Sequence, residues 1–466
     1  MIIDALYQDG VPLATHVAEG ININDNLERL KDRFQMISQL TSLLRRTVLE
    51  IDAVMNAQLT EIIEARPFQD LESRWSGLAS VVWAANKAPM LKIKLLDLNW
   101  NELSRDLHYN NEIRRSILYR LLGQNELDTL GGEPFGIAMI DHGLSTSLDT
   151  EFDDLYTAQL ICSMGEACMC PVIMSFSDDF FGETDAAWFT DLERVSKVLN
   201  GEDYRDWQAL RELSNARFLG IVLSKTQLRG RYQDREMGFL FHQWPSQSDG
   251  LWATGCYDFL RTVIAEYNRC AWFGFLKLVT NQAGMGAVLS PSLHPLPVGC
   301  ERNERANIRM TRNLAHAYSE NGLIAIAEST KNNLLYFVGN RTVTNCNGSS
   351  QTEVVTQLQS VMVACRIVHY VKVKIRSLIG QVKTAAECEV TLNNWFDAYI
   401  SPSSSSTELQ AKFPLRGARV RVSDSNSDAA RFQCEVIVRP QYQIDNVLGE
   451  IVLKTDFGAS NLAEPA

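Results

Sequence analysis

The sequence lacks any apolar run close to the ~18 residues that a membrane-spanning helix needs. Positive charge is also scarce, because 44 lysines and arginines face 56 aspartates and glutamates, for a formal net charge of −12. This surplus of negative charge argues against nucleic acid and anionic membranes as the main partners. Residues 1–6 contain no basic region followed by an apolar core, so we expect no signal peptide.

Motifs of catalysis and cofactor binding are equally scarce. The glycines at 131–132 and 284–286 come with neither a Walker lysine nor a dinucleotide fingerprint, which favours turn glycines. The seven histidines are dispersed, and Asp141-His142 is the only close acid–histidine pair. Neighbours on a strand face opposite sides, and no Gly-x-Ser-x-Gly elbow is present. We therefore predict no catalytic residue and no cofactor, and keep an α/β enzyme using Asp141, His142 and Glu133 as an alternative.

The ten cysteines are scattered, and most lie inside apolar runs. This pattern favours buried thiols in a reducing compartment over a disulfide framework. Cys162, Cys168 and Cys170 lie close enough in sequence to suggest a metal cluster. However, no histidine is near them, and Cys168-Met169-Cys170 lacks the two-residue spacer that zinc sites usually have. We predict buried structural thiols and no metal site.

A strong strand signal is present near the C-terminal end. Residues 418–422 and 432–438 alternate between two faces, as half-buried strands do. The connector 423–428 has turn chemistry, so these two runs are predicted to form an antiparallel hairpin. A third strand is predicted over 448–454, close to the end of the chain. A terminal strand of this kind can pair with its own sheet or with the sheet of another molecule.

Two long segments with apolar residues at helical spacing flank a region in which strands and helices are predicted to alternate. Apolar residues recur at helical spacing over 26–64 and 351–379, and the first stripe indicates two stacked helices or one helix laid along a partner. Thr384 is predicted to cap a further helix over 384–399. Between the stripes, strands and helices alternate, which predicts a sheet layered by helices. The predicted strands are 91–98, 137–141, 171–176, 218–223, 271–276, 323–327 and 334–338, and the main predicted helices are 102–122, 153–169, 186–199 and 252–268.

The expected fold class is α/β of a mixed α+β type, with layered sheets, flanking helices, a long N-terminal helical region and a C-terminal hairpin with a further strand. A serine-rich linker at 401–406 separates the hairpin from the preceding helix. The expected regions are an N-terminal arm with helices at 1–65, an α/β core at 66–345, a helical region at 346–400 and the hairpin with its further strand at 401–466.

A basic cluster on the second helical stripe has two interpretations. Its residues can recognise an acidic surface, or they can form a solvated helix face. The cluster consists of Arg366, His369, Lys372, Lys374 and Arg376.

Short motifs occur in a fixed order along the chain. They are Leu-Glu-Ser-Arg-Trp-Ser-Gly-Leu at 71–78, a lysine-bearing run at 91–96, Gly-Gly-Glu-Pro-Phe-Gly at 131–136, Leu-Asn-Asn-Trp at 392–395, Pro-Leu-Arg-Gly-Ala-Arg-Val at 414–420 and Arg-Pro-Gln-Tyr-Gln-Ile at 439–444. Their order and spacing resemble those of the large subunit of the type VI secretion contractile sheath, the TssC/VipB family. The resemblance covers about residues 50–455.

This resemblance implies a structural part of a machine and not an enzyme. In the family, the large subunit pairs with a small sheath subunit, and the heterodimers stack into a helical tube around an inner tube that contraction drives outward. The implied partners are a small TssB/VipA-like subunit, neighbouring copies of the chain, the inner tube protein, the baseplate and, through the small subunit, a recycling AAA+ ATPase. The implied location is the bacterial cytoplasm. A single-subunit contractile phage-tail or tailocin sheath is the nearest alternative.

Strand exchange between subunits fits both the resemblance and the terminal strand, because an added strand gains main-chain hydrogen bonds. We expect the hairpin to receive donated strands and 448–454 to be donated, which would form an intermolecular sheet. The residues expected in this exchange are Val420, Val422, Val436, Val438, Leu448, Ile451 and Leu453. Those expected to face the small subunit are Leu30, Phe34, Ile37, Leu44 and Ile51, and those expected to face the inner tube are Lys383, Glu387 and Glu389.

Overall fold

The computed structural model describes residues 23–86, 90–110, 112–146, 151–182, 186–234, 241–243, 249–273, 276, 289, 296, 300, 305–329, 334–346, 350–378, 384–400, 413–424, 431–440 and 451–458. The chain divides into two compact units. One comprises Met1–Gln69, Arg231–Asp249 and Pro297–Cys300, and the other comprises the remaining residues. The expected N-terminal arm before residue 23 and the expected linker 401–406 lie outside the described residues.

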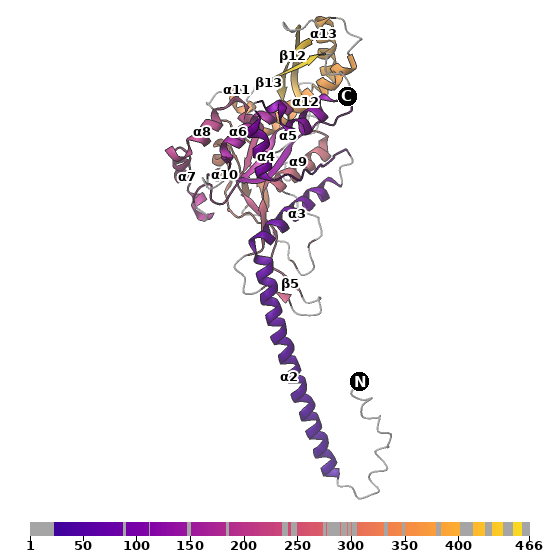
Figure 1. The fold of residues 1–466 in the computed structure, drawn as a ribbon, viewed down its shortest axis with the longest axis vertical. Helices are drawn as coiled ribbons and strands as arrows, with labels where there is room; N and C mark the ends of the chain where they lie inside the picture. Colours follow the sequence, from indigo (N-terminus) through magenta and orange to yellow (C-terminus); the bar gives the residue numbers. More distant parts are fainter. Residues whose placement is uncertain are drawn as a thin grey trace. The chain divides into compact units, whose positions relative to one another are not determined.

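A single unbroken helix, α2 (Ile23–Glu64), forms most of the described part of the first unit (Figure 1). Its 42 residues are continuous, so the alternative of two stacked helices is wrong. A short antiparallel pair, β5 (Gln233–Asp234) and β6 (Phe241–His242), contacts the C-terminal part of the helix. There, the His242 N–H donates to Asn56 Oδ1 at 3.3 Å.

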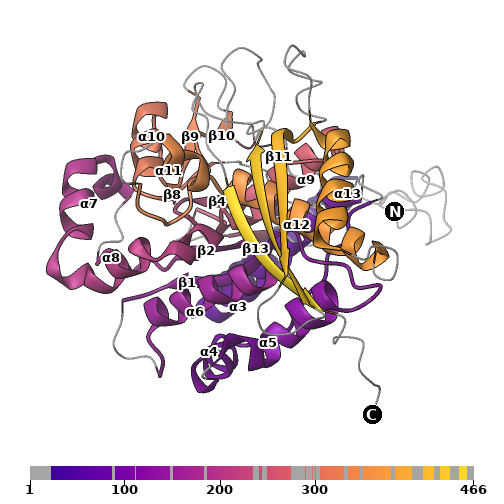
Figure 2. The same cartoon turned by 90° about the horizontal axis from the view of Figure 1, so that it is seen from above.

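A parallel sheet forms the centre of the second unit (Figure 2). Its strands in spatial order are β1 (Ala138–Leu144), β2 (Val172–Phe176), β3 (Leu219–Val222) and β8 (Leu323–Ile324). The middle strands β2 and β3 are short apolar runs, as expected for parallel strands that are covered on both faces. The helix α6 (Asp154–Cys168) makes the crossover from β1 to β2.

The two faces of this sheet belong to different parts of the core. Met174 packs in the same cluster as α6 and α8 (Arg205–Glu212), whereas its neighbour Ile173 packs with α9 (Cys256–Cys270) and α12 (Leu358–Leu378). Successive strand residues point to opposite faces, so this separation places helices on both sides of the sheet. The predicted layered α/β class is confirmed.

The other elements surround this sheet. The further helices are α3 (Arg66–Ala85), α4 (Trp100–Tyr109), α5 (Ile117–Tyr119), α7 (Leu192–Leu199), α10 (Arg312–Glu320) and α11 (Ser350–Val355), with a π-helical segment at Arg120–Asp128. Two antiparallel pairs are added by β4 (Lys225–Arg229) with β7 (Leu251–Thr254), and by β9 (Ile326–Glu328) with β10 (Leu335–Phe337).

The predicted strand at 91–98 is wrong. The segment carries no strand assignment and is largely exposed to solvent. Lys92 and Lys94 instead reach the carboxylates of Glu133 and Glu126. The alternation that suggested a strand therefore places two lysines where each can form an ion pair, without any backbone pairing.

The helix predicted over 102–122 ends at Tyr109, where α4 stops. The chain then starts again as α5, which is capped by the preceding helix: Asp106 accepts the backbone N–H groups of Ile117 and Leu118 at 3.0 and 2.8 Å. A side chain from one helix thus satisfies the free amides of the next. Helical periodicity alone does not reveal such a break.

The strand predicted over 271–276 is also absent from its described residues, 271–273 and 276. Ala271 has a left-handed φ of 60° that closes α9, and its N–H donates to the Tyr267 carbonyl at 2.7 Å. Trp272 and Phe273 are buried, and they pack in the core cluster that contains α12. Their apolar run reflects core packing and not a sheet.

The C-terminal region forms an antiparallel sheet of three strands, β11 (Leu415–Asp424), β12 (Arg431–Pro440) and β13 (Ile451–Gly458), with β12 in the middle. The predicted hairpin is confirmed, with Val420 opposite Val436. The third predicted strand is also present as β13, described from residue 451, and residues 448–450 of the prediction lie outside the described residues.

The helix α13 (Ala385–Phe396) lies alongside β11, while β13 is on the opposite side of the sheet (Figure 2). The predicted cap of this helix is confirmed, because Thr384 Oγ1 accepts the Glu387 N–H at 3.3 Å.

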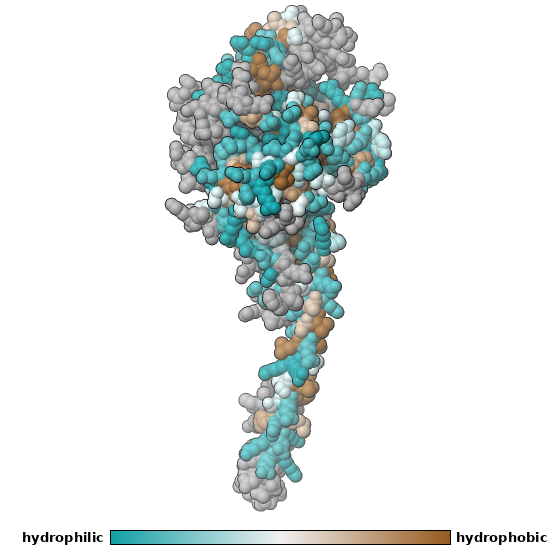
Figure 3. Space-filling model, turned by 90° about the vertical axis from the view of Figure 1, so that its left-hand side faces the viewer, coloured by the Kyte–Doolittle hydropathy of each residue, from teal (hydrophilic) through white to brown (hydrophobic). Residues whose placement is uncertain are grey.

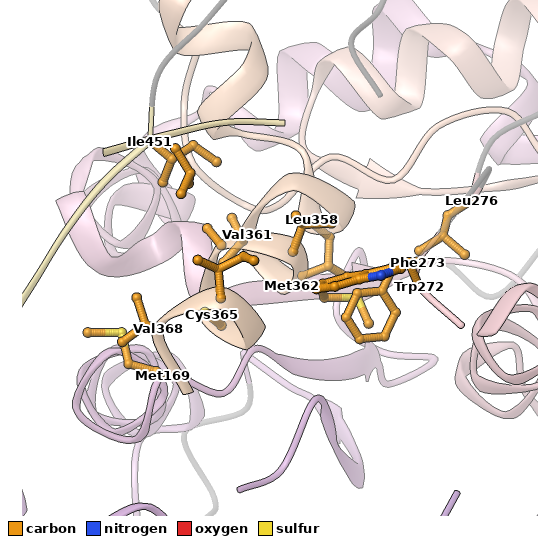
Figure 4. Packing of buried hydrophobic residues seen from close by; sticks show 14 of the residues in the cluster. Met169, Trp272, Phe273, Leu276, Leu358, Val361, Met362, Cys365, Val368 and Ile451 are labelled. Carbon is orange, nitrogen blue, oxygen red and sulfur yellow. The ribbon is translucent and has the colours of Figure 1, made fainter. Parts of the chain in front are cut away.

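The helix α12 joins the two sheets into one core. Fourteen of its 21 residues are buried, far more than one face of a helix provides. Figure 4 shows Val361 on the side of Ile451 from β13, Val368 beside Met169, and Met362 next to Trp272. Each such apolar side chain contributes about 1.5–3 kcal/mol when it is fully buried.

Candidate interaction surfaces

Five of the seven residues that we expected in strand exchange face the chain's own core. Val420, Val436, Val438 and Ile451 are at most 1% exposed, and Val422 is 9% exposed. All of them belong to the core cluster built around α12. Their side chains therefore hold the sheet in place, and pairing with another molecule is left to the strand backbones.

In the single chain, β13 pairs with its own β12, with Ile451 opposite Val438 and Leu453 opposite Val436. Leu448 lies outside the described residues. Donation of this strand to a neighbour stays a prediction about the assembled state. The same register can be formed between two chains, since it needs only a free β12 edge.

The three residues expected to face an inner tube have different environments. Lys383 lies outside the described residues, and Glu387 is exposed in the first turn of α13. Glu389 is half-buried and accepts the backbone N–H of Val422 at 3.1 Å. Glu389 therefore has a structural partner within the chain, on the outer edge of β11.

Sequence reasoning missed Asn393, which lies one helical turn after Glu389. Its Oδ1 accepts the Val420 N–H at 3.0 Å, and its Nδ2 donates to the Val420 carbonyl at 3.0 Å. The one available signal was its place in the Leu-Asn-Asn-Trp motif, which does not show what the side chain contacts.

The expected small-subunit face on α2 is exposed along its length. Its five predicted residues are between 41% and 59% exposed, and apolar side chains are visible along the helix in Figure 3. The positions 30, 34, 37, 41, 44, 48, 51 and 55 are separated by alternating steps of four and three residues, and all but Thr41 are apolar. This spacing defines a coiled-coil seam, here called the α2 seam.

The motif at 71–78 fixes α3 within the second unit. Glu72 and the buried Arg229 form a two-point ion pair, with Nε–Oε1 and Nη2–Oε2 distances of 2.6 and 2.5 Å. Gly77 lies against the ring of Tyr257, where a Cβ would come within 2.5 Å of a ring carbon. The motif is explained by packing and charge pairing of this helix.

The residues of the alternative enzyme site do not converge. Asp141 accepts the Tyr257 hydroxyl at 2.8 Å. His142 instead lies 2.9 Å from Asp154 Oδ2 and is stacked on a tryptophan, and Glu133 pairs with Lys92. Each of the three side chains has its own separate partner, so they do not form a nucleophile–base arrangement.

Three residues of the basic cluster make contacts inside the chain, which neither interpretation foresaw. The guanidinium of Arg366 lies 4.7 Å from the ring centroid of Trp272, one of four aromatic rings around it. Lys372 pairs with Asp128 at 2.9 Å, and Arg376 donates to backbone carbonyls at the end of the π-helical segment. Lys372 and Arg376 fasten α12 to this segment.

His369, the histidine of this cluster, is buried on α12, and burial lowers its pKa to about 4. In the unfolded chain its pKa is about 6.5, so acid protonates the unfolded state first and stability falls as the pH drops from 6.5 towards 4. We expect this histidine to account for about 2 kcal/mol of the stability lost between pH 7.5 and pH 5. His369→Gln should reduce the loss by that amount in denaturant titrations at the two pH values. An equal loss in both proteins would contradict the prediction.

The predicted buried thiols are found. Cys162, Cys168 and Cys170 are buried free cysteines. Burial raises the pKa of Cys168 to about 12 and the pKa of Cys162 and Cys170 well above the usual range. Such thiols stay protonated and behave as small apolar groups. Among the described residues, no group of three potential metal ligands is found.

Within the part of the chain that the structure describes, no helix combines the length and the apolar character needed to span a bilayer.

An α/β body with a terminal antiparallel sheet and a long exposed helix is typical of a protein that acts through assembly, and the comparisons with known proteins identify the class as tail sheath proteins. The tail sheath N-terminal domain of the EvpB/VC_A0108 family matches residues 45–344, and the tail sheath gpW/gp25-like domain of the same family matches residues 347–457. The chain therefore belongs to this family, named VipB. The resemblance inferred from the short motifs is confirmed.

Individual relatives are distant. The type VI secretion system sheath protein TssC1 of Pseudomonas aeruginosa is 22% identical over 419 residues, which cover 86% of this chain and 83% of that protein. Sheath tail proteins from Desulfitobacterium hafniense and Listeria innocua are 9% and 12% identical, with TM-scores of 0.29 and 0.31. These matches cover 66% and 64% of this chain, and they span 62% and 59% of the two solved structures.

Proposed function

We propose that this chain is the large subunit of a type VI secretion sheath. It joins a small sheath subunit, and the heterodimers polymerise in the bacterial cytoplasm into a helical contractile tube around an inner tube. The observation that carries the proposal is the α2 seam, since an apolar stripe of this length exposed to water indicates a binding surface. Family membership and the TssC1 relative support the same conclusion. The chain acts by assembly, and we assign it no catalytic group.

The chemistry of the α2 seam specifies its partner. The positions flanking the seam carry Lys31, Arg33 and Arg45 in the N-terminal half, and Asp52 and Glu61 in the C-terminal half. Charged residues beside a coiled-coil seam determine partner and orientation. We infer that the small subunit supplies an amphipathic helix whose flanks are acidic beside the first half and basic beside the second.

Neighbouring large subunits are joined in this proposal by exchange of β13. The pairing of β13 with β12 within one chain is replaced by the same pairing between two chains, so no main-chain hydrogen bond is lost. A head-to-tail contact of this kind that does not close on itself produces a helical filament. The inner tube, the baseplate and the recycling ATPase are further partners in the proposal, with Lys383 and Glu387 as candidate residues towards the inner tube.

Electron microscopy after co-expression tests this function. The chain expressed with a small sheath subunit should form helical tubes, and the chain expressed alone should not. Tubes formed by the chain alone would instead favour a single-subunit phage-tail sheath. A failure of the two proteins to co-purify or to form tubes would reject the proposal.

A further inference from the structure

The three-stranded C-terminal sheet has two outer edges, one along β11 and one along β13. An exposed strand edge carries backbone donors and acceptors that invite pairing with another chain. Proteins that add strands need one edge open and the other protected, because two open edges permit pairing at either side. The two edges of this sheet differ in what covers them.

Asn393 of α13 covers the edge of β11 as a neighbouring strand would. Its Oδ1 accepts the Val420 N–H and its Nδ2 donates to the Val420 carbonyl, each at 3.0 Å. The same Nδ2 donates to the Glu389 carbonyl at 2.9 Å, which fixes the orientation of the amide. A flipped amide would place oxygen against two carbonyls, so the assignment follows from the partners.

Two further contacts extend this cover along β11. Glu389 accepts the Val422 N–H at 3.1 Å, and Ile400 makes a parallel bridge with Leu415. The residues Val420 and Val422 have the same parity on the strand, so their amides point to the same side, away from β12. Side chains and backbone from the segment that precedes β11 thus occupy its edge from 415 to 422.

The edge of β13 is different. Within the described residues, no strand pairs with β13 on the side away from β12. Val452, the second residue of this edge strand, is 39% exposed. Exchange of β13 for the same strand of another chain is therefore possible on this side of the sheet without displacing any contact that the structure shows along β11.

We propose that α13 and Ile400 form an edge seal that confines strand exchange to the β12–β13 side of the sheet. The partner that this side accepts is an extended strand from a second copy of the chain. The inference rests on the proposed strand exchange and adds its direction: each chain gives one strand and receives one, so chains join in a line and do not branch. Asn393 is the residue that determines this specificity.

Hydrogen exchange of the single chain tests the seal without any assembly. Replacement of Asn393 by alanine removes both contacts to Val420, so the Val420 amide should exchange at least tenfold faster. Asn394→Ala, on the exposed neighbouring position of the same helix, should leave that rate unchanged. Asn393→Asp keeps an acceptor for the Val420 N–H and should give an intermediate rate. Unchanged exchange at Val420 in Asn393→Ala would overturn the seal.

Assembly then tests the specificity. With the edge of β11 open, Asn393→Ala should self-associate as a single chain at concentrations where the wild-type protein and Asn394→Ala remain monomeric, as measured by sedimentation. If Asn393→Ala shows faster hydrogen exchange at Val420 but sediments and forms tubes like the wild-type protein, then the seal exists but does not direct strand exchange. That result would overturn the inference. If the wild-type protein forms no tubes, the proposed function fails, whereas the exchange experiment still decides whether the seal exists.

Discussion

Cysteines placed at Ile437 and Val452 should form different cross-links before and after assembly. These residues are opposite each other on β12 and β13, and their side chains are on the face of the sheet away from α12. Neighbouring residues at a non-hydrogen-bonded antiparallel position bring their side chains close enough for a disulfide. The single oxidised chain should run as a monomer on a non-reducing gel. Assembled tubes oxidised afterwards should give a ladder of covalent multimers.

Oxidation before assembly also has a large expected effect. A disulfide between Ile437→Cys and Val452→Cys holds β13 on its own sheet, so the yield of tubes should fall at least tenfold and return after reduction. The control pairs Arg419→Cys with Ile437→Cys, which are opposite each other within the hairpin at a hydrogen-bonded position, where a Cα separation of about 5.5 Å still permits a disulfide. This control should give monomers in both states. If tubes of the 437/452 variant are oxidised after assembly and give only monomers on the non-reducing gel, then β13 is not exchanged.

Replacing Leu44 and Ile51 with aspartate should abolish co-purification with the small subunit. Burial of a leucine or isoleucine side chain contributes about 1.5–3 kcal/mol, so loss of both should weaken binding at least 100-fold. Both side chains are more than half exposed in the single chain, so the substitutions should leave its stability nearly unchanged.

The matched control carries the same added charge on another face of α2. Gln39 and Ala53 are exposed and lie outside the seam and its flanks. Gln39→Asp with Ala53→Asp should retain the small subunit in pull-down measurements, and circular dichroism should show equal helix content in both double variants. Retention of the small subunit by Leu44→Asp/Ile51→Asp would place its binding surface elsewhere.

Local sequence patterns predicted the elements whose formation depends on interactions between residues near in sequence. The hairpin of β11 and β12, the Thr384 cap and the long helix were foreseeable, because alternation, capping chemistry and helical spacing are written in neighbouring residues. The segment 271–276 was not foreseeable from its own residues. Its buried aromatic residues resemble a strand in sequence, and only their packing with α12 shows that they belong to the core.

The candidate surfaces follow the same division. The α2 seam could be inferred from the sequence, because its apolar residues recur at helical spacing and this pattern indicates a helix laid along a partner. The environments of Glu389 and Asn393 could not, since their partners Val420 and Val422 lie about thirty residues further along the chain. Long-range partners of polar side chains depend on the fold, and a single sequence does not encode them in any short pattern.

The shared helix α12 has a mechanical consequence. Because its residues pack at once against the parallel sheet and the C-terminal sheet, the described parts of these two sheets share a continuous interior. Closely packed interiors resist compression and transmit strain. In the proposed tube, a force pulling on β13 would therefore reach the parallel sheet with little loss, and we expect the sliding that shortens the tube to occur at the joints between subunits.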